Sequence, residues 1–517
     1  MRIAVVGSGF AGSILARVLA VQGHRVLLLD RGRHPRFALG ESSTPLAALC
    51  LERLAARYGL EDLHALAAWG RWTERLPHLR RGLKRGFTFY GHEPGRPYAN
   101  GPKNERRLLV AASPSEAIAD THWLREDVDH HLVREAGAAG VEVVEEVDLD
   151  GLERASGGVW CLSGTHRGRT VRFEADLLFD ASGPGGFLAR HLPIPAVETE
   201  PRPDTRLVFG HFEGVASFPE LPIGPYPDEQ AAVHHLLEEG WMYVLPFDHG
   251  TVSAGFVVSR NAGLGALPPE RDWEHLLARY PTLREQFASA RPVRPLGMIP
   301  RLQHRLSAAS GEGWAALPHA YCFLSPLFST GIAWSLLAVE RLALSLETGT
   351  GLDRYGALLG READHLQRLL GGAYEALRDF DLFAAYSSLY FAAASFSEAS
   401  QRLLPTAPGG GPWAWEGFLG STDPEMDGIL ESCLAALPPG RPFEEEIRSA
   451  IAPRNLAGLA DPHRNRLYPV DLAPLVENAG LLGLTKEEIR REIPRLRGAE
   501  DESTLEDSES LSRKSKP

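Results

Sequence analysis

The chain has 517 residues, too many for one hydrophobic core, so about two or three domains are expected. Its net charge of −13 argues against nucleic acid as a partner, because no excess of basic side chains is available to pair with phosphates. No apolar run is long enough to predict a membrane-spanning helix, and the cysteines are too far apart to indicate a metal site or a disulfide framework. These features predict a cytoplasmic protein without nucleic-acid or membrane partners.

The first thirty residues have the pattern of a dinucleotide-binding fold. The stretch RIAVVGSGFAGSILARVLAVQGHRVLLLD indicates a strand, a tight turn, a helix and a second strand. Gly7 permits the turn, Gly9 lets the backbone approach a pyrophosphate, and Gly12 lets the helix pack closely on the strand. Asp30 ends the second strand, where it can accept hydrogen bonds from a ribose. The alternative is a glycine-rich turn that binds no ligand, and the pattern alone does not separate NAD from FAD.

Three later segments resemble, in the same order, the FAD-contacting segments of flavin-dependent halogenases and related flavin monooxygenases. They are GESSTP at 40–45, the helical stretch that begins WLREDVD at 123, and LLFDASGPGGF at 177–187. The resemblance places Arg125 near the flavin and makes Asp129 structural. Together with the turn at 322–332, it implies an FAD site formed by Gly7, Gly9, Phe10, Ala11, Gly12, Asp30, Arg31, Gly40, Glu41, Ser42, Arg125, Asp180, Ala181, Pro326, Gly331 and Ile332.

A candidate catalytic lysine lies between the first two of these segments. GLKRGFTFY at 82–90 resembles the K-x-G-x-x-F segment of the halogenases, with Lys84, Gly86 and Phe89 in register. The resemblance implies that Lys84 hydrogen-bonds hypohalous acid and directs the halogen to the substrate. The alternative is a solvated surface lysine, because Lys84 belongs to the basic run LRRGLKRG.

Residues 201–290 are rich in β patterns such as RLVFGHFEG and TVSAGFVVS, which predict an antiparallel sheet over the flavin. Within this range, GWMYVLPF partly matches the W-x-W-x-I-P motif of the halogenases. Trp241 and Pro246 match, whereas Tyr243 and Leu245 replace the second Trp and the Ile. In the family these bulky residues separate substrate from flavin. The resemblance implies the same shielding role for Trp241, Tyr243 and Pro246, and for Phe328 further along the chain.

The stretch CFLSPLFSTGI at 322–332 satisfies the halogenase pattern F-x-x-P-x-x-S-x-G. The amides of Thr330 and Gly331 can form a small positive nest, which the resemblance assigns to chloride or bromide. Pro318 and His319 stand where related turns often have Gly-Asp, and His319 either donates to the cofactor or lies at the surface. Tryptophan halogenases have a Glu directly before S-T-G. Phe328 at this position favours a phenol or pyrrole, whose ring activates itself, over free tryptophan.

Beyond residue 340 the pattern becomes helical, and the polar end of the chain has the composition of a disordered tail. The fold class expected is α/β: a Rossmann-type FAD-binding domain of the flavin monooxygenase type, an antiparallel β substrate layer and a helical C-terminal region. The predicted ranges are 1–200 and 291–345 for the FAD-binding domain, 201–290 for the substrate sheet, 346–498 for the helical domain and 499–517 for the tail.

The resemblance implies an FADH2- and O2-dependent halogenase that installs chloride or bromide on a phenol or pyrrole, free or tethered to a carrier protein, through hypohalous acid. No second glycine-rich fingerprint for NAD(P)H is present, so a separate flavin reductase is expected to supply FADH2. One alternative is a monooxygenase or reductase of the same fold that does not halogenate, which the altered W-x-W-x-I-P motif supports. Another is a non-catalytic flavin-binding or carrier-interacting protein.

Overall fold

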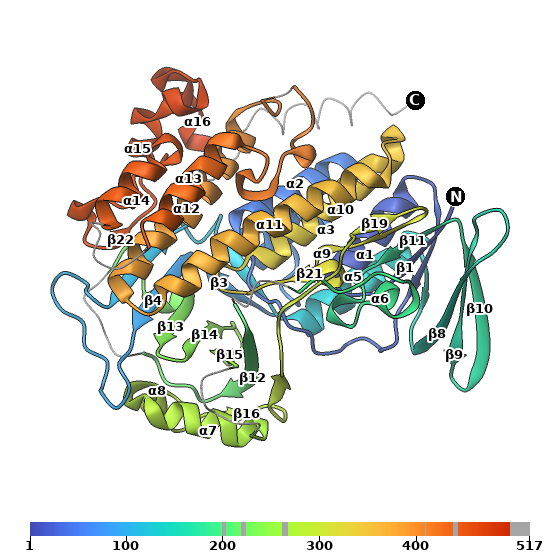
Figure 1. Cartoon of the computed structure of the whole chain (residues 1–517), viewed down its shortest axis with the longest axis horizontal. Coiled ribbons are helices and arrows are strands. Elements are labelled where there is room, and N and C mark those ends of the chain that lie inside the picture. Colours follow the sequence, from blue (N-terminus) through green and yellow to red (C-terminus); the bar gives the residue numbers. More distant parts are fainter. Residues whose placement is uncertain (199–202, 219–223, 261–266, 409, 438–442, 497–517) are drawn as a thin grey trace.

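The computed structural model describes residues 1–198, 203–218, 224–260, 267–408, 410–437 and 443–496 (Figure 1). The predicted tail at 499–517 therefore lies outside the described residues. Among the described helices, none combines the length and the apolar character needed to cross a bilayer.

The predicted Rossmann-type sheet combines four strands from residues 2–180 with two short strands from residues 310–316. Its strand order is β19 (Ser310–Gly311), β20 (Trp314–Ala316), β11 (Leu177–Asp180), β1 (Arg2–Val6), β2 (Arg25–Leu29) and β7 (Glu142–Val144). The pairs β20–β11, β11–β1, β1–β2 and β2–β7 are all parallel. Parallel strands are covered by helices on both faces, which explains why β1 and β2 are nearly continuous apolar runs. Helices α1 (Phe10–Val21) and α5 (Arg125–Ala138) pack beside this sheet.

A separate antiparallel sheet of β8 (Val147–Arg154), β9 (Trp160–His166) and β10 (Arg169–Ala175) projects from the N-terminal end of the molecule (Figure 1). Its exposed strand β10 alternates between more and less exposed residues, as expected for a sheet with one face in water.

The second large sheet covers more of the chain than the predicted range 201–290. Its order is β16 (Arg291–Pro292), β12 (Thr205–Glu213), β15 (Thr251–Ser259), β14 (Gly240–Pro246), β13 (Ala232–Leu237), β4 (Gly86–Gly91), β5 (Arg107–Ala111) and β22 (Leu467–Tyr468), with β17 (Gly297–Ile299) also on β12. The pairs β12–β15, β15–β14 and β14–β13 are antiparallel, whereas β13 and β4 are parallel. Every residue of β4 is buried, so this strand requires cover on both faces and joins the interior of the sheet.

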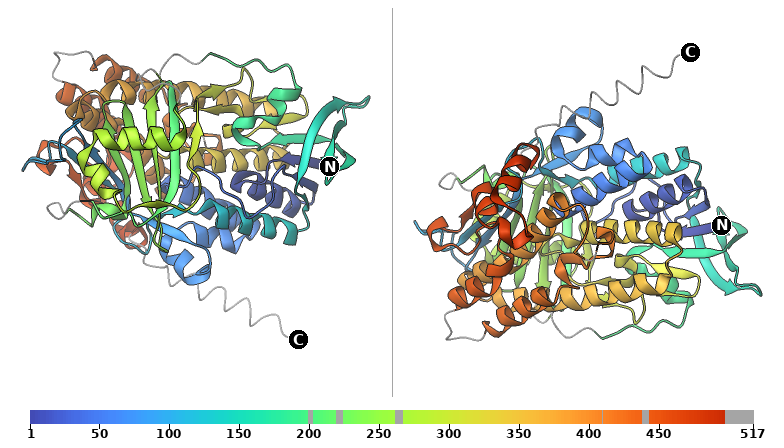
Figure 2. Two further views of the ribbon diagram at one scale, coloured as in Figure 1. Left: turned by 90° about the horizontal axis from the view of Figure 1, so that it is seen from below. Right: turned by 90° about the horizontal axis from the view of Figure 1, so that it is seen from above.

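Helices enclose the second sheet on both sides (Figures 1 and 2). On one face, α7 (Pro269–Arg279) and α8 (Pro281–Gln286) bury Trp273 against Phe212. On the other face, Phe383 of α12 (Phe380–Leu403) packs against Phe89 of β4. The remaining helices and short strands are α2 (Pro45–Tyr58), α3 (Glu61–Leu66), α4 (Trp69–Arg75), β3 (Arg81–Lys84), β6 (Asp120–Trp123), α6 (Phe187–His191), β18 (His304–Arg305), α9 (Pro318–Tyr321), β21 (Cys322–Phe323), α10 (Thr330–Thr348), α11 (Leu352–Ala376), α13 (Pro424–Ala435), α14 (Phe443–Ile451), α15 (Leu472–Glu477) and α16 (Lys486–Leu496).

A buried ion pair joins the two long helices α10 and α11. Both Arg341 and Glu362 are fully buried, and the guanidinium donates to the two carboxylate oxygens at 2.8 and 2.6 Å. Trp334 Nε1 and the Phe418 amide also donate to Glu362, at 2.7 and 2.6 Å. All of these donors converge on one carboxylate, so its loss leaves a buried positive charge without compensation.

We expect Glu362→Ala to lower the free energy of unfolding by about 3–5 kcal/mol, because Arg341 would remain buried and unpaired. Urea denaturation followed by circular dichroism measures the change. The control is Glu487→Ala on α16, which removes one partner of an exposed pair with Arg490. Equal stability of Glu362→Ala and the control would contradict the prediction.

Candidate functional site

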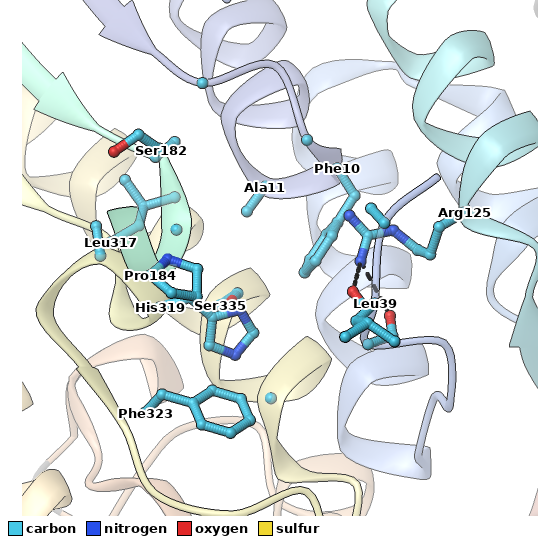
Figure 3. A pocket seen from close by; sticks show the side chains of 18 of the residues that line it. Phe10, Ala11, Leu39, Arg125, Ser182, Pro184, Leu317, His319, Phe323 and Ser335 are labelled. Atoms are coloured by element: carbon cyan, nitrogen blue, oxygen red, sulfur yellow. Dashed lines mark hydrogen bonds between the residues drawn. The ribbon is translucent and has the colours of Figure 1, made fainter. Parts of the chain in front are cut away.

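A cavity of about 910 Å³ lies between the Rossmann-type sheet and the second sheet. Figure 3 shows Phe10, Leu39 and Arg125 on one side of it, with Ser182, Pro184, Leu317 and His319 on the opposite side. The volume is at the upper end of the range typical of small-molecule and cofactor sites, roughly 300–1,000 Å³. Of the residues predicted to bind FAD or halide, the cavity is lined by Gly7, Gly9, Phe10, Ala11, Gly12, Asp30, Arg31, Gly40, Glu41, Ser42, Arg125, Ala181, Pro326, Thr330, Gly331 and Ile332.

In the glycine turn before α1, Gly7 and Gly12 are required for close packing, whereas Gly9 leaves room for a ligand. Gly7 has φ +107°, and a Cβ there would overlap the Ala181 carbonyl. A Cβ on Gly12 would overlap the carbonyl of Gly7. At Gly9, by contrast, the nearest heavy atom to such a Cβ is Arg125 Nη2 at 3.5 Å. Gly9 therefore leaves open space at the positive end of α1, where a pyrophosphate can bind.

Asp30 is an ionised acceptor at the wall of the cavity. Its carboxylate accepts hydrogen bonds from the amide and hydroxyl of Ser8, both at 2.7 Å, from the Gly32 amide at 2.7 Å and from Arg36 at 2.9 Å. Burial opposes ionisation, but Arg36 and these hydrogen bonds hold the pKa of Asp30 below its usual range. The predicted ribose acceptor thus also ties the glycine turn to the segment after β2.

Two side chains fix the loop that contains GES. Arg125 donates to the carbonyls of Leu39 and Gly40 at 2.5 and 3.0 Å, as the dashed lines of Figure 3 show. The same guanidinium forms a two-pronged pair with the buried Asp129, at 2.8 and 2.7 Å. Asp129 therefore orients Arg125 and does not line the cavity. The backbone of this loop is held against the start of α5.

Glu41 connects the same loop to the second sheet. Its carboxylate is 2.8 Å from Nε2 of His211 on β12 and accepts a hydrogen bond from Ser253 Oγ of β15 at 2.6 Å. Glu41 therefore links the GES loop, which lines the cavity, to two strands of the second sheet.

The turn at 323–331 brings the first residues of α10 to the wall of the cavity. Ser329 has a left-handed backbone conformation, φ 55°, and α10 begins at Thr330. The first amides of a helix have no acceptor within the helix and carry the positive end of its dipole. Thr330 and Gly331 both line the cavity, so their location suits a small anion.

His319 lies over Gly331: a Cβ on that glycine would be 2.7 Å from His319 Nε2. The imidazole lines the cavity, which rules out the surface interpretation, and donation to the cofactor stays a prediction. Burial, assisted by the nearby Arg125 and His304, lowers the pKa of His319 to about 4. His319 is therefore a neutral donor or acceptor at this site near neutral pH.

Comparisons with known proteins agree with this geometry. The FAD dependent oxidoreductase family matches residues 2–341. Monodechloroaminopyrrolnitrin halogenase PrnC of Pseudomonas fluorescens is 28% identical over 75% of this chain and 70% of its own. Tetracycline 7-halogenase of Kitasatospora aureofaciens is 30% identical over 68% of this chain and 67% of its own. The crystal structure of halogenase PltM with phloroglucinol and FAD has the same fold, with a TM-score of 0.81, 22% identity and coverage of 90% of this chain and 99% of that one.

The chain is a member of the flavin-dependent halogenase family. FAD is accordingly the cofactor of this enzyme, and halide is its co-substrate. The residues fit the cofactor, because Gly9 leaves a cradle at the start of α1 that a side chain would fill. The Gly9 turn would hold the pyrophosphate, and Asp30 would lie at the ribose.

The halogenase places three of the predicted site residues away from the cavity. Asp180 is buried below the turn after β11, where it accepts hydrogen bonds from the Ser182 and Leu188 amides at 2.9 and 2.8 Å. Phe328 is fully buried and stacks on Tyr390, with ring centroids 4.4 Å apart. Pro246, at the end of β14, also lies outside the lining, whereas Trp241 and Tyr243 belong to it.

Lys84 also lies outside the cavity lining, but it is not a surface residue. The side chain has no exposed area, and Nζ donates to the Ser43 carbonyl at 2.5 Å. The ammonium lies 4.1 Å from the centroid of the Phe87 ring. Ser42, the neighbour of Ser43, does line the cavity. The GES loop therefore lies between the FAD-side cavity and the buried side chain of Lys84.

Several cavity residues were missed by the sequence interpretation. They are chiefly Arg36, Phe37, Leu39, Pro184 and Ser335. Arg36 follows the predicted acid by six residues in the basic stretch after β2, which could have indicated a partner for Asp30. Ser335 is one helical turn after Gly331 and on the same face of α10, so helical spacing could have identified it.

Proposed function

We propose that this halogenase installs chloride or bromide on an electron-rich aromatic ring, a phenol or a pyrrole, by means of hypohalous acid guided by Lys84. The substrate is free or tethered to a carrier protein, and a separate flavin reductase supplies FADH2. Bound reduced FAD, with O2, supplies the oxidising equivalents that convert halide into hypohalous acid.

The observation that carries the proposal is the fully buried ammonium of Lys84 next to the cofactor cavity. One of its N–H groups is used by the Ser43 carbonyl, and the ammonium lies beside the Phe87 ring. Such an ammonium donates to the oxygen of hypohalous acid and makes the halogen more electrophilic. The ring then exchanges a proton for the halogen, and the oxygen leaves as water.

The chain's other groups hold the halide and keep substrate from the flavin. The amides of Thr330 and Gly331 bind the anion beside a neutral His319. Trp241 and Tyr243 form the wall between the two sheets, and Trp241 is fixed by a hydrogen bond from Nε1 to the Tyr374 hydroxyl at 2.9 Å. This wall favours halogenation, because it prevents direct transfer of oxygen from flavin to substrate.

The surroundings of Lys84 support a flat, electron-rich substrate. The Phe87 ring lies beside Lys84 and packs in a cluster with Phe89, His234 and Phe391, with 4.8–6.3 Å between the ring centroids of contacting pairs. Phe328 provides no carboxylate to assist a poorly nucleophilic ring. The phenol bound in the PltM complex supports the same class of substrate.

The proposal is tested by mass spectrometry of the product. The full-length protein is incubated with FAD, NADH, a flavin reductase and bromide, together with phenols and pyrroles offered free and on carrier proteins. The expected product carries the paired isotope pattern of bromine and requires both bromide and O2. A hydroxylated product that forms equally without bromide would instead establish the monooxygenase alternative, which Tyr243 and Leu245 favour by their departure from the halogenase motif.

A further inference from the structure

A closed polar cluster surrounds Lys84 on the far side of the GES loop. Lys84 on β3 is directly paired with Asp120 on β6 in antiparallel register, and Gly82 is paired with His122. Directly paired residues on antiparallel strands have Cβ atoms roughly 4.5–5.5 Å apart, on the same face of the sheet. Lys84, Asp120 and His122 are all buried. The fold therefore brings one cation and one carboxylate close together, and both are shielded from bulk solvent.

The polar atoms of this cluster are not satisfied by one another. Asp120 Oδ2 is buried and makes no hydrogen bond within the part of the chain that the structure describes. Neither ring nitrogen of His122 makes a well-formed hydrogen bond, although the Ala231 carbonyl lies nearby. Buried polar groups without partners are costly in a purely structural cluster. The presence of such groups beside Lys84 indicates a site that receives a polar ligand.

Lys84 and Asp120 control each other's charge. Burial lowers the pKa of the lysine and raises the pKa of the aspartate, whereas the charge of each favours ionisation of the other. The two residues therefore tend to be charged together or neutral together. Without the carboxylate, burial alone would act on Lys84 and remove its proton at lower pH.

The other titratable groups around Lys84 and Asp120 do not replace the effect of Asp120 on the charge of Lys84. His122 and His234 are held neutral by burial and by the nearness of Lys84. From α2 and α12, the groups that act on Asp120 are Glu52, Glu398 and Arg402. Arg402 is paired with both glutamates, at 3.0 and 2.8 Å. Tyr226 and Tyr390 are further titratable neighbours of Asp120, and burial raises the pKa of both hydroxyls so that they stay neutral.

We propose that Asp120 is a positioning residue that keeps Lys84 in its ammonium form, the form that can donate to hypohalous acid. The inference rests on the proposed role of Lys84 in guiding hypohalous acid. Asp120 supplies the buried negative charge, and β6 supplies the rigid attachment, because the Ser43 amide donates to the Thr121 carbonyl at 3.0 Å. Position 328 has no carboxylate in this chain. The carboxylate near Lys84 is instead that of Asp120 on β6, and it acts through the lysine.

The composition of the chain allows a direct test. It contains five lysines, at 84, 103, 486, 514 and 516, so labelling of the lysine ε-carbons gives a simple NMR spectrum. The FAD-loaded wild type, Asp120→Asn and Asp120→Glu are titrated with base, and the Lys84 signal is assigned from its loss in Lys84→Arg. We expect Lys84 to lose its proton at lower pH in Asp120→Asn than in the wild type, and Asp120→Glu to restore the wild-type value. Asp120→Ser is a second variant that removes the charge with less bulk, in case Asp120→Asn does not fold.

The control is Glu105→Gln, which removes an exposed carboxylate outside the cluster and should leave the Lys84 titration unchanged. In bromination assays, the high-pH limit of activity should move to lower pH in Asp120→Asn, whereas oxidation of FADH2 should not. An unchanged Lys84 titration in both charge-removing variants would overturn the inference. Absence of bromination by the wild type would instead refute the proposed function, and the NMR titration would still decide whether Asp120 sets the charge of Lys84.

Discussion

Replacing Lys84 with alanine is expected to reduce bromination by more than about 100-fold, the range in which positioned proton donors act. The ammonium is the donor that makes hypohalous acid more electrophilic. Lys84 is the only buried lysine of the described chain. FAD binding and the O2-dependent oxidation of FADH2 should be retained, because Lys84 lies outside the cofactor cavity. The measurement is brominated product formed per FADH2 oxidised, which separates loss of guidance from loss of cofactor chemistry.

The matched control for this loss is Lys103→Ala, which removes an exposed lysine and should leave the yield unchanged. Because Lys84→Ala leaves Asp120 without its positive neighbour, the double variant with Asp120→Asn is measured alongside it to exclude simple destabilisation. A yield per FADH2 in Lys84→Ala equal to that of the wild type would show that the lysine has no part in halogen transfer.

Alanine at two positions of the same glycine turn should produce two different defects. Gly12→Ala forces a Cβ into the Gly7 carbonyl, so we expect a loss of at least about 3 kcal/mol in stability together with loss of FAD. Gly9→Ala meets nothing closer than 3.5 Å in the protein and should fold normally. Its methyl group occupies the space in which the pyrophosphate approaches α1, so FAD should bind roughly tenfold or more weakly, a cost of about 1.4 kcal/mol.

Thermal unfolding and flavin fluorescence distinguish these two outcomes. If Gly9→Ala unfolds at the same reduced temperature as Gly12→Ala, the turn serves packing at both positions. If Gly9→Ala binds FAD as tightly as the wild type, the pyrophosphate does not lie at the start of α1.

The sequence was most informative where a residue's role depends on its immediate neighbours. The glycine turn, Asp30 and the start of α10 each follow directly from a strand or turn pattern, and the structure brings them to one cavity. The Rossmann-type sheet and the helical C-terminal region were predicted for the same reason: strand and helix periodicities are local.

Other features depend on pairings between distant segments and could not be predicted. Lys84 lies in a basic run typical of a surface, yet its pairing with β6 and its bond to Ser43 bury it completely. The addition of β4 and β5 to the second sheet requires β13, about 140 residues later. Asp180 ends a strand, which is a common position for a ligand-binding acid. Its carboxylate instead accepts hydrogen bonds from the amides of Ser182 and Leu188. His319 becomes a cavity residue only because α9 brings it over Gly331.

The central claim is that a halide lies on the amides of Thr330 and Gly331, at the end of the cavity nearest the start of α10. The most direct measurement is a crystal structure of the FAD complex in bromide, with diffraction recorded at the bromine absorption edge. An anomalous peak within hydrogen-bonding distance of these two amides is the predicted result. A bromide bound only elsewhere in the cavity, with the amides of Thr330 and Gly331 facing no anion, would contradict it.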